Sequence, residues 1–110
     1  MVVDQVSEAE LDRLFQALAD STRRDIVARV SAAEYSVSGL AALYTMSFAA
    51  VQKHIAVLER ASLVTKEKRG REQIVQANHE GLGQARQLLD QLEAIWLQRV
   101  DRIAQVLNES

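Results

Sequence analysis

Apolar residues recur at every third or fourth position in the first part of the chain, which is typical of helices with one buried face. The stretch SEAELDRLFQALAD, residues 7–20, predicts a first helix with Ser7 as its N-cap and Glu10 at the spacing of a capping box. Asp20 can cap a second helix, STRRDIVARVSA, over residues 21–32. SVSGLAALY then predicts a short third helix.

The stretch MSFAAVQKHIAVLERASLV predicts a fourth helix over residues 47–61, with Ser47 as its N-cap. This helix has two different faces. One face is apolar and should pack in the core: Val51, Ile55 and Leu58. The other face mixes an aromatic ring with polar groups: Phe48, Ala49, Gln52 and Lys53. A phenylalanine held in water beside a glutamine and a lysine adds no stability, so this second face indicates a binding surface.

After Ser62 the pattern changes from helical to extended. LVTKEK and REQIVQA predict two short strands on either side of Arg69-Gly70, which together form a hairpin over residues 63–77. Gly70 supplies the positive φ that such a turn usually needs. Residues 80–108 predict a last helix of roughly 40 Å at 1.5 Å per residue.

The last predicted helix carries an apolar stripe along its whole length. Its positions are Leu82, Ala85, Leu89, Leu92, Trp96, Val100, Ile103 and Leu107. A domain this small cannot bury such a stripe by itself. We therefore expect this stripe and the stripe of the first helix to pack against a second copy of the chain. The expected homodimer interface is Leu11, Leu14, Phe15, Leu89, Leu92, Trp96, Val100 and Ile103. Trp96 is interpreted as an anchor of the dimer core, and a ligand-pocket wall is the second interpretation.

Composition excludes several classes of protein. The 110 residues suit one domain, residues 1–110, with a modest core. The absence of cysteine excludes disulfides, thiolate metal sites and cysteine nucleophiles. No signal peptide or membrane span is recognisable, so a cytoplasmic protein is expected. No glycine-rich phosphate loop or carboxylate–histidine cluster is present, so we expect neither an enzyme nor a cofactor.

The net charge of −2 conceals a basic segment. Residues 53–72 carry six basic and three acidic side chains, a local charge of +3, whereas residues 1–52 carry −3 and residues 73–110 carry −2. By itself this pattern fits a solvated hairpin tip as well as a nucleic-acid surface.

The expected order of elements is that of a winged helix-turn-helix, so the expected fold class is mainly α with a small two-stranded β-hairpin. In this fold the third helix braces the fourth, whose outer face enters the major groove of double-stranded DNA. The hairpin tip reaches the phosphates or the adjacent minor groove. A basic hairpin directly after a polar-faced helix therefore tips the charge argument towards DNA.

Three motifs resemble the ArsR/SmtB family of small bacterial winged-helix repressors, and the resemblance extends over nearly the whole chain. LFQALADSTRRDIV resembles the family's second-helix signature, MSFAAVQKHIAVLERASLV its recognition-helix signature, and KEKRGREQIV its wing. The resemblance implies a homodimer joined by its first and last helices, which represses its own operon until a signal releases it. It identifies no inducer.

Departures from the family pattern concern metal sensing. Ser36 and Ser38 stand where many members sense metals with a Cys-x-Cys pair, and hydroxyls are poor ligands for soft metals. Other members bind zinc through histidines and carboxylates of the last helix, but here that helix has no histidine beyond the preceding His79. The sequence therefore predicts no metal and resembles the non-metal-sensing branch of the family.

Three further departures concern the backbone. Ser21 replaces the usual proline of the second helix, Ser62 the usual glycine after the recognition helix, and Gly39 a frequent glutamate. Each change removes a conformational preference that favours the family's backbone, so lower stability of the binding lobe is expected.

The residues expected to contact DNA lie on the fourth helix and on the hairpin. They are Ser47, Phe48, Ala49, Gln52, Lys53, Lys68, Arg69 and Arg71. Gln52 suits adenine, Lys53 suits guanine or a phosphate, and the ring of Phe48 could contact thymine methyl groups or pack on the preceding turn. No local sequence partner is evident for all three hairpin cations, so at least one is expected to contact phosphate or the minor groove.

Two further expectations concern residues outside this set. His54 is interpreted as a half-buried brace of the fourth helix. Arg23 and Arg24 lie in the first turn of the second helix, where cations are disfavoured. They are expected to pair with a carboxylate such as Asp20 or, alternatively, with a DNA phosphate.

The sequence thus predicts a homodimeric, sequence-specific DNA-binding regulator that represses its own operon from an inverted-repeat operator. Helix 47–61 would enter the major groove and hairpin 63–77 would serve as the wing. The alternative is a dimeric winged-helix module that binds a protein and has no DNA specificity of its own.

Overall fold

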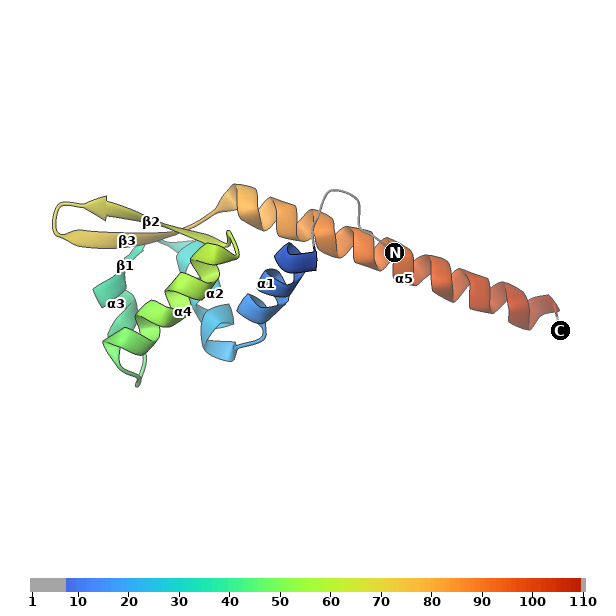
Figure 1. The fold of residues 1–110 in the computed structure, drawn as a ribbon, viewed down its shortest axis with the longest axis horizontal. Helices are drawn as coiled ribbons and strands as arrows, with labels where there is room; N and C mark the ends of the chain where they lie inside the picture. The colour runs from blue at the N-terminus through green and yellow to red at the C-terminus, as the bar shows by residue number, and fades with distance from the viewer. Residues whose placement is uncertain (1–7, 110) are drawn as a thin grey trace.

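Eight helices and strands follow one another in the computed structural model, which describes residues 8–109 of the chain. In chain order they are α1 (Glu8–Leu18), α2 (Ser21–Ala32), β1 (Tyr35–Ser36), α3 (Val37–Ala41), α4 (Phe48–Arg60), β2 (Val64–Arg69), β3 (Glu72–Ala77) and α5 (His79–Glu109). Figure 1 shows that α1 to α4 and the sheet form a lobe, and that α5 leaves this lobe and runs to the C-terminal end. The order is the one expected from the sequence, with one strand added.

Side chains at the N-termini of α2 and α4 explain where these helices begin. Asp20 Oδ1 accepts a hydrogen bond from the backbone N–H of Arg23 at 3.1 Å, and Ser47 Oγ accepts one from Ala50 at 3.1 Å. Both caps agree with the sequence prediction, and both satisfy N–H groups that a first helical turn leaves unpaired. The predicted cap Ser7 lies outside the described residues.

The sheet has three antiparallel strands in the order β1-β3-β2, one more than the sequence predicts. β2 and β3 form the expected hairpin, with Gly70 at a φ of 60° in its turn. The added strand contains only Tyr35 and Ser36, which pair with Val75 and Ile74. Two residues are too few to show the alternation by which a strand is recognised in a sequence, so β1 leaves no signal there.

The core lies between the helices of the lobe, the sheet and the beginning of α5. The predicted inner face of α4 is part of it, because Val51, Ile55 and Leu58 are each at most 1% exposed. They pack with Leu14, Ala17, Ile26, Val30, Val37, Leu40, Leu63, Val64, Val75 and Leu88. Burial of a side chain of this size stabilises a fold by about 1.5–3 kcal/mol, so the inner face of α4 fixes which way its outer face points.

Helix α4 ends in a Schellman motif with Ser62 in the glycine position. The backbone N–H of Leu63 donates to the carbonyl of Leu58 at 3.0 Å, and that of Ser62 donates to Glu59 at 3.0 Å. Ser62 has a φ of 62°, in the left-handed region, as its place in the family pattern implies. Leu58 and Leu63 are both buried, which supplies the hydrophobic contact of the motif.

The N-terminus of α5 packs directly on this turn. A Cβ at Gly81 would lie 1.5 Å from the carbonyl oxygen of Ser62, so the backbones approach more closely than any other residue type allows. The backbone N–H of Asn78 also donates to the carbonyl of Leu63 at 3.0 Å. These contacts determine where α5 leaves the lobe.

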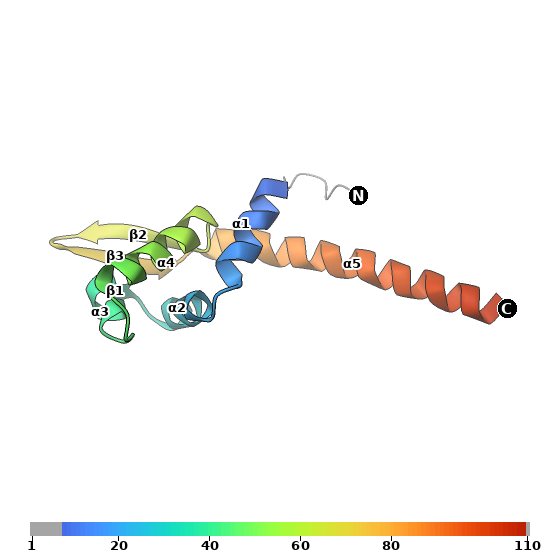
Figure 2. The same ribbon diagram turned by 60° about the horizontal axis from the view of Figure 1, so that its bottom comes forward.

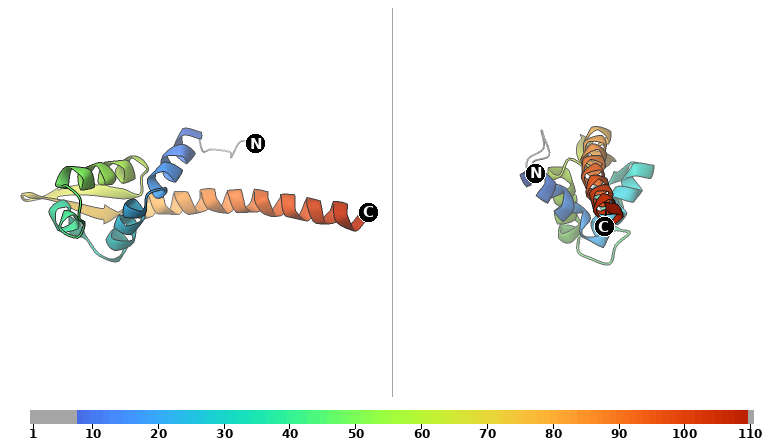
Figure 3. Two further views of the ribbon diagram at one scale, coloured as in Figure 1. Left: turned by 90° about the horizontal axis from the view of Figure 1, so that it is seen from below. Right: turned by 90° about the vertical axis from the view of Figure 1, so that its right-hand side faces the viewer.

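Only the first part of α5 packs on the lobe, although its 31 residues make it about 46 Å long. Leu88, which the predicted stripe omits, is the residue of this helix that packs deepest in the core, whereas its neighbour Leu89 is exposed. Figures 2 and 3 show that the second half of α5 extends past every other described element. Its exposed large apolar side chains are Trp96, Leu97, Val100, Ile103, Val106 and Leu107.

Candidate nucleic-acid interface

The turn between α3 and α4 is tied to α2 through Tyr44. The Tyr44 hydroxyl donates to Asp25 Oδ2 at 2.5 Å, and Arg29 Nε donates to the same oxygen at 2.8 Å. Burial and then the bond to Asp25 raise the pKa of Tyr44 to about 12, so its hydroxyl remains a donor at neutral pH. This contact holds the turn from which α4 starts. The sequence offers no signal for it, because Tyr44 and Asp25 lie on different elements.

The outer face of α4 is exposed along its first two turns. Ala49, Gln52 and Lys53 are exposed, and Phe48 keeps 47% of its surface in contact with solvent. Ser47 caps the helix, and its side chain is occupied by the N–H of Ala50. The structure therefore brings together all five residues that the sequence assigns to this helix, and all five are exposed.

Arg23 connects three helices. Its Nε donates to the carbonyl of Ala17 at 2.9 Å and its Nη2 to that of Gln16 at 2.6 Å, both in the last turn of α1. Its Nη1 lies 3.2 Å from Nδ1 of His54, on α4. Arg24 likewise donates to the carbonyl of Leu18 at 2.7 Å.

Neither guanidinium forms the expected ion pair with a carboxylate of residues 8–109, and the alternative of a DNA phosphate stays a prediction. Their guanidinium groups bind carbonyl groups in the last turn of α1, where cations are favoured. His54 serves as the expected brace, since it is half-buried and links α4 to Arg23 of α2.

A cleft of about 200 Å³ lies between α4 and the hairpin. Phe48 and Gln52 line it from α4, and Lys66 and Arg71 line it from the hairpin. Figure 3 shows α4 and the hairpin side by side, at the end of the molecule opposite the C-terminus. Lys66 Nζ also lies 3.5 Å from Glu59 Oε1 on α4, which links the two elements. The predicted helix surface and the predicted wing therefore border one cleft.

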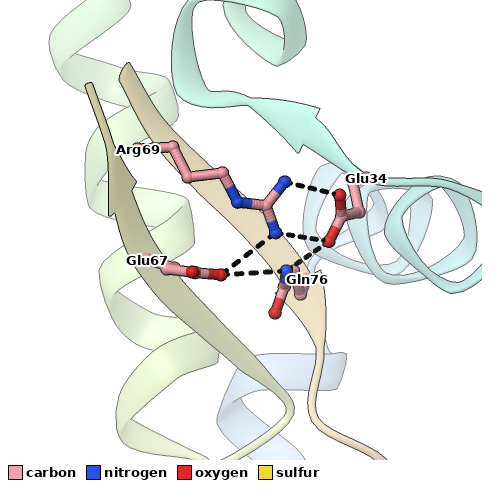
Figure 4. Close-up of polar contacts among 4 residues, drawn as sticks. All are labelled: Glu34, Glu67, Arg69 and Gln76. Carbon is pink, nitrogen blue, oxygen red and sulfur yellow. Dashed lines mark hydrogen bonds and ion pairs between the residues drawn. The ribbon is translucent and has the colours of Figure 1, made fainter. Parts of the chain in front are cut away.

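Arg69 is bonded to two carboxylates, Glu34 and Glu67. Its two Nη atoms donate to the two carboxylate oxygens of Glu34 at 2.8 and 2.9 Å, and Nη2 donates to Glu67 Oε2 at 3.1 Å (Figure 4). Gln76 Nε2 donates to both carboxylates. The two acidic partners raise the pKa of Arg69, and its guanidinium lowers the pKa of Glu34. Sequence reasoning misses this cluster because Glu34 lies 35 positions before Arg69.

The two serines that replace the family's cysteine pair have different environments. Ser36 Oγ accepts the N–H of Gly39 at 2.9 Å, so Ser36 is the N-cap of α3, whereas Ser38 is exposed. Within residues 8–109, no group of three or more potential metal-ligating side chains gathers at one place. None of the helices in the same range is long and apolar enough to cross a membrane.

Helix α3 is followed by the turn that Tyr44 holds, then by α4 with its exposed polar face, and the β2–β3 hairpin lies beside α4. These elements define a winged helix-turn-helix DNA-binding protein. The chain belongs to the ArsR family of transcriptional regulators. A family described as "Bacterial regulatory protein, arsR family" matches residues 20–66, from the N-cap of α2 into β2. The predicted fold class and family are thereby confirmed. Members of this family are transcriptional regulators and not enzymes.

Relatives agree with this assignment. The chain is 36% identical over 97 residues to the HTH-type transcriptional regulator Rv2034 of Mycobacterium tuberculosis. This match covers 88% of this chain and 88% of that regulator. It matches the structure of an ArsR-like transcriptional regulator from Rhodococcus sp. RHA1 with a TM-score of 0.83 and 33% identity, over 100% of this chain and 99% of that one. It also has the fold of the homodimeric winged helix-turn-helix domain of Mb0332 from Mycobacterium bovis, with a TM-score of 0.64 and 19% identity over 86% of this chain and 91% of that one.

Proposed function

We propose that this protein is a homodimeric, sequence-specific DNA-binding regulator that represses its own operon, and that α4 enters the major groove of an inverted-repeat operator. The observation that carries this proposal is the division of α4 into two faces. Its inner residues are almost completely buried, whereas Phe48, Ala49, Gln52 and Lys53 are exposed beside the cleft that leads to the hairpin. A major groove about 12 Å wide admits one helix with such a face.

The chemistry of the exposed face suits base recognition. Gln52 offers an amide for bidentate bonding to adenine, and Lys53 offers a cation to guanine or to a phosphate. Ala49 adds little bulk, so the backbone of α4 can approach the base edges. Phe48 can contact thymine methyl groups with the part of its ring that the turn leaves exposed. Lys68 and Arg71 at the hairpin tip would add contacts to the DNA backbone.

The homodimer is proposed to form through α1 and α5, which flank a single winged helix-turn-helix domain. Phe15, Leu89, Trp96, Val100 and Ile103 are exposed, and Trp96 keeps 64% of its surface in contact with solvent. Leu11 and Leu92 are partly buried and remain in the proposed interface. Leu14 is only 5% exposed because it packs in the core of its own chain, so it does not remain in that interface. The homodimeric state of the Mycobacterium bovis domain supports the proposal.

Gel shifts on the DNA upstream of the protein's own gene test this function. We expect a salt-sensitive complex with an inverted repeat whose half-sites are about 34 Å apart, or a multiple of this distance. In a reporter assay, deletion of the gene should raise transcription from that promoter. If neither this DNA nor a pool of random duplexes yields a salt-sensitive complex, the proposed DNA-binding function is wrong, and co-purification of a stoichiometric protein partner would favour the interaction module.

A further inference from the structure

The β2–β3 hairpin has two faces that carry different charges. Residues directly opposite each other in an antiparallel pair point to the same face. The observed pairs Glu67 with Ile74, Arg69 with Glu72, and Thr65 with Gln76 therefore share one face. The bonds among Glu67, Arg69 and Gln76 agree with this assignment.

Lys66 and Lys68 occupy the other face, because side chains alternate along a strand. Lys66 reaches Glu59 of α4 at 3.5 Å, so this second face is turned towards α4. Arg71 follows Gly70 in the turn and lines the same cleft as Lys66. The cations that the sequence places together on one hairpin are thus divided between its two sides.

Arg69 carries its charge away from the hairpin tip. The backbone of Arg69 lies opposite Glu72, the first residue of β3. Its guanidinium, however, binds Glu34, a carboxylate that also accepts a hydrogen bond from Gln76 near the other end of β3. Figure 4 shows the side chain reaching across the hairpin to Glu34. Two carboxylates and one guanidinium leave this cluster with one net negative charge, which repels a phosphate.

The pair with Glu34 also spans two parts of the fold. Glu34 lies between α2 and β1, and β1 pairs with β3 only at Tyr35 and Ser36. The tip of the hairpin therefore extends beyond the third strand. A bidentate arginine–carboxylate pair fixes both distance and orientation, unlike a single flexible contact. It connects the end of β2 to the lobe.

We propose that Arg69 positions the wing and does not contact DNA, and that Glu34 is the group through which it acts. This inference rests on the proposed function and sharpens it. Lys68 and Arg71 become the tip cations that bind the DNA backbone, and the Arg69–Glu34 pair holds the hairpin where they can do so.

The test compares DNA affinity over a range of salt concentrations for wild type, Glu34→Gln, Arg69→Gln and the double variant. We expect each single substitution to weaken binding about two- to fivefold and the double substitution to weaken it no further, because both remove one interaction. The salt slope should stay at its wild-type value, since no phosphate contact is lost. All these side chains are exposed, and circular dichroism would verify that the variants fold.

Two matched controls separate charge from position. Glu72→Gln removes one negative charge from the same hairpin, but Glu72 takes no part in the Arg69 bonds shown in Figure 4, so DNA binding should stay unchanged or become tighter. Lys68→Gln should reduce the magnitude of the salt slope by about 0.9. In a side-chain spectrum of ¹⁵N-arginine-labelled protein, the Arg69 signal should respond to Glu34→Gln in both the free and the DNA-bound protein.

Other outcomes overturn the inference in distinguishable ways. If Arg69 contacts phosphate, Glu34→Gln will release it and tighten binding beyond the Glu72→Gln control, and Arg69→Gln will reduce the salt slope by about 0.9. That result rejects the positioning role and leaves the proposed function intact. If the wild-type chain forms no salt-sensitive complex, both proposals are wrong.

Discussion

At the scale of single residues, Ser62 occupies a backbone conformation that glycine adopts most easily. Its φ of 62° is required by the two hydrogen bonds that end α4, and the neighbouring Leu63 must enter the core at this point. A side chain in the left-handed region costs about 1 kcal/mol, because Cβ approaches a carbonyl oxygen. The turn is thus formed against a local preference and maintained by the packing around it.

Replacement of Ser62 by glycine should raise the free energy of unfolding by about 0.5–1 kcal/mol, measured by urea denaturation at fixed protein concentration. The matched control is Ser31→Gly within α2, where φ is helical and glycine should lower stability by a similar amount. If both substitutions destabilise the protein, the backbone at Ser62 is not strained.

The bond between Tyr44 and Asp25 predicts a pH dependence. The Tyr44 hydroxyl and then Arg29 lower the pKa of Asp25 in the folded protein. A group whose folded pKa lies below its unfolded value stabilises the fold above the unfolded pKa, and this stabilisation is lost as the pH falls through the folded pKa. Tyr44→Phe should therefore reduce stability most at neutral pH, and the difference from wild type should shrink below about pH 4.

Urea denaturation of wild type and Tyr44→Phe between pH 7 and pH 3 measures this difference. Tyr35→Phe is the matched control, because it removes a hydroxyl for which the structure gives no bond to a carboxylate. Its effect should be the same at all these pH values. A pH-independent difference for Tyr44→Phe would contradict the assigned bond.

At the scale of elements, α4 and the hairpin divide the proposed recognition between them. The exposed face of α4 presents groups that can distinguish bases, whereas the hairpin tip presents cations that bind any phosphate. Arg23 and His54 link α4 to the end of α1. The position of α4 therefore depends on α1, which is part of the proposed dimer interface.

Gln52→Ala should reduce discrimination at one base pair of each half-site by about 1–3 kcal/mol and leave the salt slope almost unchanged. Lys68→Ala should weaken binding to all sequences similarly and reduce the slope. Competition gel shifts with single-base operator variants, repeated at several salt concentrations, measure both effects. Identical behaviour of the two variants would show that the division between α4 and hairpin is wrong.

At the scale of the whole molecule, α5 explains both the shape and the proposed assembly. The molecule measures 67 × 28 × 23 Å because this helix continues far beyond the lobe. Four of its exposed apolar residues, Trp96, Val100, Ile103 and Leu107, recur at intervals of three and four, the spacing of a helix that packs against another helix. Two copies joined in this way would carry two copies of α4 to one DNA duplex.

Trp96→Asp should convert the dimer to a monomer in analytical ultracentrifugation, since a carboxylate would be buried in an apolar interface. Binding to an operator with two half-sites should weaken by about 100-fold or more, while binding to a single half-site should change little. Gln98→Asp, which adds the same charge at an exposed polar position, is the control and should stay dimeric. A dimeric Trp96→Asp variant would contradict the proposed interface.

The sequence by itself determined the helices, the hairpin, the caps Asp20 and Ser47, and the two faces of α4. These features depend on residues within a few positions of one another, so periodicity and capping chemistry reveal them. The same local signals carried the family resemblance. The same periodicity correctly predicted that Phe48, Ala49, Gln52 and Lys53 share one exposed face of α4.

Only the tertiary structure decided how distant residues pair. It added β1, buried Leu88, which lies outside the predicted stripe, directed Arg23 to the carbonyl groups of α1 and joined Arg69 to Glu34. Each of these outcomes depends on elements that meet only after the chain has folded, and no local pattern encodes such a meeting. The cations of the hairpin show the difference plainly: the sequence places them next to one another, and the alternation and pairing of the strands separate them.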